Sequence, residues 1–431
     1  MSENLGFKIE NIVSKEFGIS PKLIKMSEMV SKEIVPLLEE IERIVEFNQI
    51  KVLSAMKRSY LSDYHLTGST GYGYSDIGRD TIDQIYADVF KAEDALVRPH
   101  IVSGTHAITL CIQGVLRPGD ELLSATGAPY DTLKKVLLGN HYGSLKDFGI
   151  TYREASLKNQ KPDYDAIREN INEKTRMVLI QRSRGYSLRP SLSIDEIEHL
   201  IKFIKSIKHD IICFVDNCYG EFVEAREPIE VGADLCAGSL IKNPGGGVAP
   251  TGGYVVGKRD LVRQCAYRLT APGLDKSIGS ALFSNHLIAQ GLFYSPKVVG
   301  EALKGAVYTS RMMEKLGFEV SPRFDEKRCD IVTAAILGEE DALISFCRGI
   351  QKAGPVDSHV QPEPSAMPGY EHKVIMAGGS FIQGSSIELS ADGPLREPYA
   401  VYVQGGLNFA HVKIGIMSGL QALMDSGKLT L

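Results

Sequence analysis

The chain has 431 residues, and its 48 lysines and arginines against 53 aspartates and glutamates give a formal net charge of −5 at pH 7. This slightly acidic balance argues against nucleic acid or an anionic membrane surface as a partner, because both attract basic proteins. Hydrophobic residues make up 43% of the chain and charged residues 23%, a globular composition that argues against a disordered or coiled-coil protein.

At about 150 residues per domain, the length predicts two to three domains, of which residues 1–65 form an N-terminal helical segment. The start of this segment, MSENLGFKIE, lacks the basic region and apolar run of a secretory signal. Farther along, apolar residues recur at the three- and four-residue steps of one helix face: Leu37, Leu38, Ile41, Ile44, Val45 and Val52. Pro36 is expected to kink or restart that helix. The next stretch, GSTGYGYSDIGRD at residues 68–80, is predicted to be a loop.

Residues 66–284 are predicted to form a large α/β domain. Short apolar runs at residues 121–123, 177–180, 211–215 and 254–256 alternate with amphipathic stretches. The clearest amphipathic stretch opens with Ser193 and has Glu196 three residues later, the pattern of a helix capping box. Strands that alternate with helices indicate crossover units and a mainly parallel sheet covered on both faces.

Residues 285–431 are predicted to form a smaller α+β domain, with the N-terminal helices packed beside it. The run SFIQGSSIELS at residues 380–390 is expected to be a strand, and the polar residues 391–396 are expected to be a turn.

Cysteine usage and hydropathy predict a soluble cytoplasmic protein. The seven cysteines are odd in number and contain no C-x-x-C pair, a pattern typical of reduced thiols rather than disulfides. No stretch reaches the roughly 18 uninterrupted apolar residues of a membrane span. The ten histidines are scattered, with none paired to a cysteine at ligand spacing, so no metal site is expected.

The first of three segments with chemical potential is Ser103-Gly104-Thr105-His106, which precedes an apolar helical pattern. Glycine and hydroxyl residues at a helix N-terminus leave free backbone N–H groups, which suit a phosphate. A simple N-cap is the alternative interpretation.

The second segment, FVDNCYGE, places Asp216 at the carboxyl end of a predicted buried strand, where ligands bind in open α/β sheets. A cap of the next helix is an equally good interpretation of that carboxylate. The third segment, GSLIKNPGGG, holds Lys242 between apolar residues and a proline–glycine run. Partial desolvation there would lower the pKa of its amine and favour the nucleophilic form; a lysine stem lying along apolar surface is the alternative.

Together, the three segments match the requirements of pyridoxal 5′-phosphate (PLP). Its aldehyde needs a lysine, its pyridine nitrogen needs an acid, and its phosphate needs a helix N-terminus with hydroxyls. Asp216 and Lys242 lie 26 positions apart (242 − 216), which is enough to cross one helix to a neighbouring strand.

Four segments also carry a resemblance to a known family: SGTHAI, SRGYSLRPSL, FVDNCYGEF and GSLIKNPGGGVAPTGGYVVGK. Nearly the whole chain resembles the fold-type I PLP-dependent enzymes of the Cys/Met-metabolism group, the relatives of cystathionine β-lyase and methionine γ-lyase. More closely, the chain resembles their bacterial aluminium-resistance branch, often described as carbon–sulfur lyases. Nothing in the chain itself implies contact with aluminium.

The resemblance implies a role for each matching residue. Lys242 would form the aldimine with the cofactor and move the proton at the substrate α-carbon. Asp216 would pair with the pyridinium nitrogen. Gly104 and Thr105 would hold the phosphate, with Ser239 as a further ligand.

Aromatic residues are expected to complete the cofactor site. In the family a tyrosine of a neighbouring subunit reaches the phosphate, and Tyr72 or Tyr74 matches its position, although the family's Tyr-x-Arg pattern is absent. Tyr130 is the nearest match for the ring that stacks on the cofactor, with His106 as the alternative. A homodimer or homotetramer with the active site at the subunit interface is therefore expected.

For the carboxylate of an amino-acid substrate we expect a bidentate arginine. Arg396 is the first candidate, and Arg182 and Arg184 are the alternatives. The implied activity is elimination at a carbon–sulfur bond. An aminotransferase or decarboxylase on the same fold, a nucleotide-binding module and a non-catalytic scaffold are the competing interpretations. The natural substrate and the choice between β- and γ-elimination stay open.

Overall fold

The computed structural model describes residues 2–431, with side chains from residue 5 onward. The chain forms two compact units: the larger comprises Glu46–Pro296, and the smaller comprises the residues up to Val45 together with Lys297–Leu431. The sequence predicted divisions after residues 65 and 284 instead. The two observed divisions, after Val45 and after Pro296, fall inside the long helices α3 (Val35–Arg58) and α10 (Ser284–Lys315). The composition of the sequence does not change within these helices, so it does not reveal the divisions.

The larger unit is built on a seven-stranded sheet. Its strand order is β1-β9-β8-β7-β6-β2-β3; β9 is antiparallel to both neighbours, and the remaining pairs are parallel. The strands are β1 (Asp94–Arg98), β2 (Glu121–Ser124), β3 (Thr151–Glu154), β6 (Thr175–Gln181), β7 (Ile212–Asp216), β8 (Leu235–Ser239) and β9 (Gly253–Gly257). All four apolar runs predicted as strands in this region are thus strands of one mainly parallel sheet.

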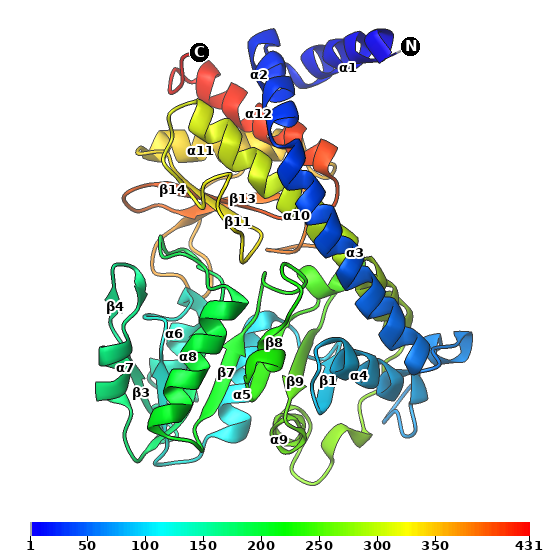
Figure 1. Ribbon diagram of the computed structural model, residues 1–431, viewed down its shortest axis with the longest axis vertical. Coiled ribbons are helices and arrows are strands. Elements are labelled where there is room, and N and C mark those ends of the chain that lie inside the picture. Colours follow the sequence, from blue (N-terminus) through cyan, green and yellow to red (C-terminus); the bar gives the residue numbers. More distant parts are fainter. Residues whose placement is uncertain (1) are drawn as a thin grey trace. The chain divides into compact units, whose positions relative to one another are not determined.

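Helices cover this sheet, and in Figure 1 α8 lies on the side toward the viewer while α5 lies behind. The elements are α4 (Ile77–Val89), α5 (Gly104–Val115), α6 (Asp131–Leu138), α7 (Tyr164–Asn170), α8 (Ile194–Ile207), α9 (Arg259–Leu269), the short helices η1 (Asp63–Leu66), η2 (Pro228–Val231), η3 (Asn243–Gly245) and η4 (Asp275–Ser277), and the small hairpin β4 (Leu157–Lys158) and β5 (Lys161–Pro162). The core includes the fully buried Ile112 of α5, Phe214 of β7 and Val262 of α9. The predicted capping box is present, with Ser193 and Glu196 capping α8 reciprocally.

The smaller unit combines helices with a five-stranded antiparallel sheet of order β10-β11-β14-β13-β12. Besides α10, its elements are α1 (Ser2–Phe17), α2 (Pro21–Glu33), β10 (Val320–Ser321), β11 (Val332–Ile336), α11 (Glu340–Lys352), β12 (Val374–Ala377), β13 (Ser390–Pro394), β14 (Ala400–Gln404) and α12 (Phe409–Asp425). The N-terminal helices therefore belong to the same compact unit as the C-terminal sheet. Pro36 restarts the helical chain in the first turn of α3, after α2 has ended.

Two local predictions are wrong. The predicted turn at residues 391–396 is largely strand β13, and the predicted strand at residues 380–390 is mostly irregular chain. Polar groups are tolerated in β13 because they are paired: the buried Asp392 accepts a hydrogen bond from Gln404 of β14. Likewise, the end of the loop predicted at 68–80 already belongs to α4, whose N-cap is Asp76.

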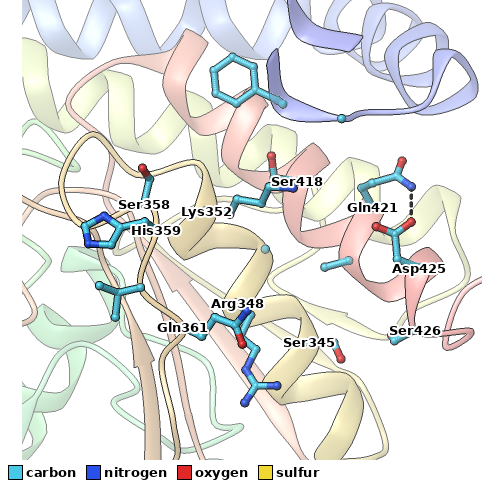
Figure 2. A pocket seen from close by; sticks show the side chains of 15 residues that line it. Ser345, Arg348, Lys352, Ser358, His359, Gln361, Ser418, Gln421, Asp425 and Ser426 are labelled. Atoms are coloured by element: carbon cyan, nitrogen blue, oxygen red, sulfur yellow. Dashed lines mark hydrogen bonds between the residues drawn. The ribbon is translucent and has the colours of Figure 1, made fainter. Parts of the chain in front are cut away.

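α11 and α12 run side by side in the smaller unit, and a cavity of about 580 Å³ lies along them. Figure 2 shows side chains of both helices along its walls, with the hydrogen bond from Gln421 to Asp425 on α12. We refer to this cavity as the α11–α12 groove. Among the described residues, no helix is both long and apolar enough to cross a membrane.

Candidate active site

Two of the predicted site residues, an acid and a hydroxyl residue, each lie at the end of a strand, and the two strands are neighbours in the large sheet. Asp216 is the last residue of β7, and Ser239 is the last residue of β8. The two strands are parallel, with Asp216 paired to Ala237. The carboxyl ends of parallel strands meet at one edge of a sheet, which is where ligands bind in open α/β folds. We call this edge, with the helix start and loops that surround it, the strand-end site.

The N-terminus of α5 lies against the same strand ends. Ser103 is the N-cap, and its hydroxyl accepts a hydrogen bond from the backbone N–H of His106 at 3.1 Å. A Cβ added to Gly104 would lie 3.2 Å from Sγ of Cys218 and 3.4 Å from Cβ of Ser239. Glycine therefore allows the helix start to approach both strand ends. Its backbone N–H groups, like those of every first helical turn, form a potential anion site.

Lys242 follows β8 by three residues and is half-buried as the N-cap of the short helix η3. Its Nζ lies 3.9 Å from the centre of the Tyr219 ring. Desolvation lowers the pKa of the Lys242 amine, as the sequence predicted, but neighbouring acidic groups outweigh this and raise the pKa above its ordinary value. These groups belong to Cys218, Tyr219, Asp216 and Glu221. The lowered pKa expected from the apolar neighbours in the sequence is therefore wrong for the free chain.

Asp216 is a nearly buried carboxylate, only 6% exposed. Its Oδ1 accepts a hydrogen bond from the backbone N–H of Cys218 at 3.1 Å. Burial raises the pKa of Asp216, and the positive charge of Lys242 opposes that shift. A buried carboxylate of this kind is stabilised by a cationic or hydrogen-donating partner.

The residues at the strand-end site fit the cofactor predicted from the sequence. The start of α5, with Gly104 close to Ser239, offers a phosphate cradle that a Cβ would crowd. Asp216 is a buried acceptor suited to a protonated ring nitrogen, and Lys242 is a primary amine suited to an aldehyde. Thr105 lies in the first turn of α5, and its hydroxyl forms a hydrogen bond with the hydroxyl of Thr132, with 2.8 Å between the two oxygens.

Tyr130, the predicted stacking residue, is the N-cap of α6. Its backbone N–H donates to Oε1 of Gln181, the last residue of β6, at 2.8 Å. Its ring lies 5.8 Å, centre to centre, from that of Tyr186. The alternative, His106, has a pKa lowered by burial, and its Nδ1 accepts the N–H of Val102. The hydrogen bond to Gln181 holds Tyr130 at the edge of the sheet on which Asp216 lies, because Gln181 pairs with Asp216.

Tyr72 and Tyr74 lie on a loop that is held firmly at its base and exposed at its tip. Both side chains are about 70% exposed. The guanidinium of Arg79 donates to the carbonyls of Gly73 and Gly279, and the N–H of Gly279 donates to the carbonyl of Tyr72 at 2.9 Å. The loop backbone is therefore held in place while it presents two exposed aromatic side chains.

The three candidate arginines occupy different settings. Arg396 follows β13 in the smaller unit. The Arg182 guanidinium is fully buried and donates to Asn217, to the carbonyl of Gly220 and to Glu224, and these contacts argue against a role in substrate binding. Arg184 is 2% exposed, and its Nε and Nη1 have no acceptor among the described residues.

The buried neighbours of Lys242 include a group that the sequence analysis missed. Glu221 is fully buried, its Oε1 accepts a hydrogen bond from the Tyr254 hydroxyl at 2.8 Å, and its Oε2 has no partner among the described residues. Burial raises the pKa of Glu221 to about 8. Its position five residues after a strand-end aspartate is the only signal in the sequence, and that signal does not distinguish it from a surface acid.

Known proteins resemble this chain along nearly its whole length. The sequence profile of the methionine gamma-lyase family matches residues 23–424. The uncharacterised protein YnbB of Bacillus subtilis (strain 168) is 54% identical over 409 residues, which is 94% of this chain and 97% of that protein. The crystal structure of a carbon–sulfur lyase involved in aluminium resistance from Clostridium novyi NT is 49% identical, with a TM-score of 0.90, and the match covers 94% of this chain and 97% of that one. A candidate cystathionine beta-lyase involved in aluminium resistance from Clostridium acetobutylicum is 45% identical, with a TM-score of 0.93 and coverages of 96% and 99%.

Proposed function

The chain belongs to the methionine gamma-lyase family of PLP-dependent carbon–sulfur lyases, and we propose that it eliminates a thiol from a sulfur-containing amino acid at the strand-end site. The family and the fold-type I architecture expected from the sequence are confirmed. The observation that carries the proposal is that one edge of the sheet brings together a helix N-terminus, the buried carboxylate of Asp216 and the amine of Lys242.

In the proposed site, each residue has a separate task. Lys242 would hold the cofactor through its aldehyde, and its free amine would take the proton from the substrate α-carbon. Asp216 would keep a proton on the ring nitrogen, and Gly104, Thr105 and Ser239 would hold the phosphate. When bound, the cofactor supplies an electron sink for the charge left at the α-carbon. Arg396, which follows β13 in the smaller unit, stays a prediction from the sequence for the substrate carboxylate, since a guanidinium matches a carboxylate bidentately.

We further propose that the site is completed by a second copy of this chain, in a homodimer or homotetramer. The exposed Tyr72 and Tyr74 support this, because their loop is pinned at its base by Arg79 while both rings stay in solvent. Light scattering would give the molar mass in solution. We expect at least twice the 47.2 kDa of one chain, and a monomer that binds PLP normally would contradict the proposal.

Product analysis tests the reaction. The purified protein, saturated with PLP, is incubated with a panel of sulfur amino acids that includes L-cystathionine and L-methionine. We expect release of a thiol together with pyruvate or 2-oxobutanoate. Conversion of a keto acid to a new amino acid without thiol release would instead identify an aminotransferase.

A further inference from the structure

We propose that Arg184 binds a carboxylate of the amino-acid substrate at the strand-end site. This inference rests on the proposed function and deepens it, because it identifies an anionic group that the substrate must present to the larger unit. It starts from the guanidinium of Arg184, which is buried and whose charge is paired with no carboxylate among the described residues.

The side chain of Arg184 is 2% exposed, and its Nε and Nη1 have no hydrogen-bond acceptor among the described residues. Arg184 also forms no ion pair with a carboxylate of the described residues. Burying a charged group without a partner is among the costliest arrangements in a folded protein. An arrangement of this kind is retained where function requires it, because a bound anion then supplies the missing partner.

Arg182 shows how the same loop treats a structural arginine. It is also buried, and its Nε is likewise without an acceptor among the described residues, but its charge is balanced by the carboxylates of Glu224 and Glu227 at 2.9 and 3.8 Å. Two residues farther along the loop, Arg184 has no such balance. The contrast shows that the fold can neutralise a buried arginine in this region and does not do so at position 184.

The loop that carries Arg184 is anchored at the strand-end site on both sides. The backbone N–H of Arg182 donates to the carbonyl of Asp216 at 3.1 Å. On the other side, Gly185 lies against the Tyr130 ring, since a Cβ added there would be 2.8 Å from it. Along the chain, Arg184 therefore lies between Arg182, which is hydrogen-bonded to Asp216, and Gly185, which packs on the Tyr130 ring.

The chemistry of the ligand follows from the guanidinium. Its parallel N–H groups match a carboxylate bidentately, and a desolvated pair of this kind is strong. The strand-end site has a separate cradle for the cofactor phosphate at the start of α5. The partner of Arg184 is therefore assigned to the substrate, either as the α-carboxylate or as a carboxylate on the side chain or leaving group.

The test uses the PLP-saturated protein and the variant Arg184→Met, which keeps the length of the side chain and removes its charge. Glycine, which carries only an α-carboxylate and no leaving group, is titrated while the cofactor absorbance is followed. KM is measured for L-methionine, with one carboxylate, and for L-cystathionine, with two. We expect an apparent affinity or KM about tenfold weaker or more, as for a lost charge-assisted hydrogen-bond pair, with PLP affinity changed by less than about threefold.

The pattern of losses identifies the carboxylate. If Arg184 binds the α-carboxylate, all three ligands weaken; if it binds a second carboxylate, only L-cystathionine does. Unchanged binding of all three ligands would overturn the proposal, as would a large loss of PLP affinity with unchanged KM. The glycine titration needs no elimination, so a failure of the proposed lyase activity would leave this test intact.

A thermal unfolding series without added ligand separates this role from a structural one. Arg184→Met removes a buried unpaired charge, so its Tm should equal or exceed that of the unaltered chain. Arg182→Met removes one partner of a buried charge cluster, so its Tm should fall by several degrees. If Arg184→Met lowers Tm as much as Arg182→Met does, Arg184 is structural and the proposal is wrong. Arg184→Lys should retain part of the carboxylate affinity, because it keeps the charge without the planar fork.

Discussion

The strand-end site of the larger unit and the α11–α12 groove of the smaller unit both gather charged side chains, but in opposite settings. In the groove, Lys352 is exposed, and Arg348 is paired with the exposed Glu363. At the strand ends, Asp216 and Arg184 are almost completely buried. Charges at the wall of an open cavity keep their hydration and cost little, whereas buried charges need a partner.

This difference decides which of the two regions is a candidate for catalysis. The groove has a large volume, about 580 Å³, and Figure 2 shows that polar and charged side chains, short serines among them, line it. The strand-end site has groups whose pKa values are shifted by burial and by one another. Perturbed titration of clustered groups is typical of reactive sites, and cavity volume alone is not.

Replacing one lysine in each region by alanine should give the largest difference in activity between the two regions. Lys242→Ala removes both the amine that would bind the cofactor and the proposed base, so we expect loss of the visible absorbance and a fall in kcat of about 10³-fold or more. Lys352→Ala in the groove should leave both unchanged. Absorbance spectra and thiol-release assays measure the effect. A yellow, active Lys242→Ala protein would remove Lys242 from the mechanism.

The acids of the two regions give the next contrast. Asp216→Asn keeps the size of the side chain but removes the negative charge that is proposed to keep a proton on the ring nitrogen, so we expect kcat to fall by about 10²-fold or more. Because this carboxylate is buried and its pKa is already raised, its loss should change Tm only slightly. Asp425→Asn in the groove should change neither quantity. Near-normal turnover of Asp216→Asn would show that the acid has another role.

The strand end at Asp216 and the start of α5 could both be predicted from the sequence, because each depends on a short-range pattern. A buried apolar run followed by an acid predicted the strand end at Asp216, and glycine and hydroxyl residues before a helical pattern predicted the start of α5. The state of Lys242 could not be predicted, because the acidic groups that raise its pKa come mostly from residues 216–221, on another strand and its loop. The same limit explains β13: its polar residues are satisfied by β14, a partner that the local pattern does not reveal.

Glycines in the two regions should separate cofactor affinity from stability. In Gly104→Ala the new methyl group would lie 3.2 Å from Cys218 Sγ and 3.4 Å from Ser239 Cβ, so the helix start must shift slightly. We expect PLP affinity to weaken by roughly tenfold, because phosphate contacts at a helix N-terminus depend on close backbone approach. In Gly349→Ala the methyl group would lie 2.4 Å from the carbonyl oxygen of Ser418, so Tm should fall with little change in PLP affinity. Equal PLP affinity in Gly104→Ala and the unaltered chain would place the phosphate elsewhere.

The smallest expected effect is a pH dependence that belongs to the strand-end site alone. Burial raises the pKa of Glu221 to about 8 in the folded chain, whereas an unfolded glutamate titrates near 4.3. Between these values the folded chain keeps a proton that the unfolded chain has lost, so this group makes the folded state less stable as pH rises from about 4 to 8. Glu221→Gln keeps a carbonyl oxygen for the Tyr254 hydroxyl and cannot ionise. Its Tm relative to the unaltered chain should therefore increase between pH 5 and pH 8, by a few degrees, while Asp425→Asn in the groove should show no such trend. A constant difference in Tm across this range would mean that Glu221 ionises in the folded chain as an ordinary glutamate does, and that the acids around Lys242 are more hydrated than their burial indicates.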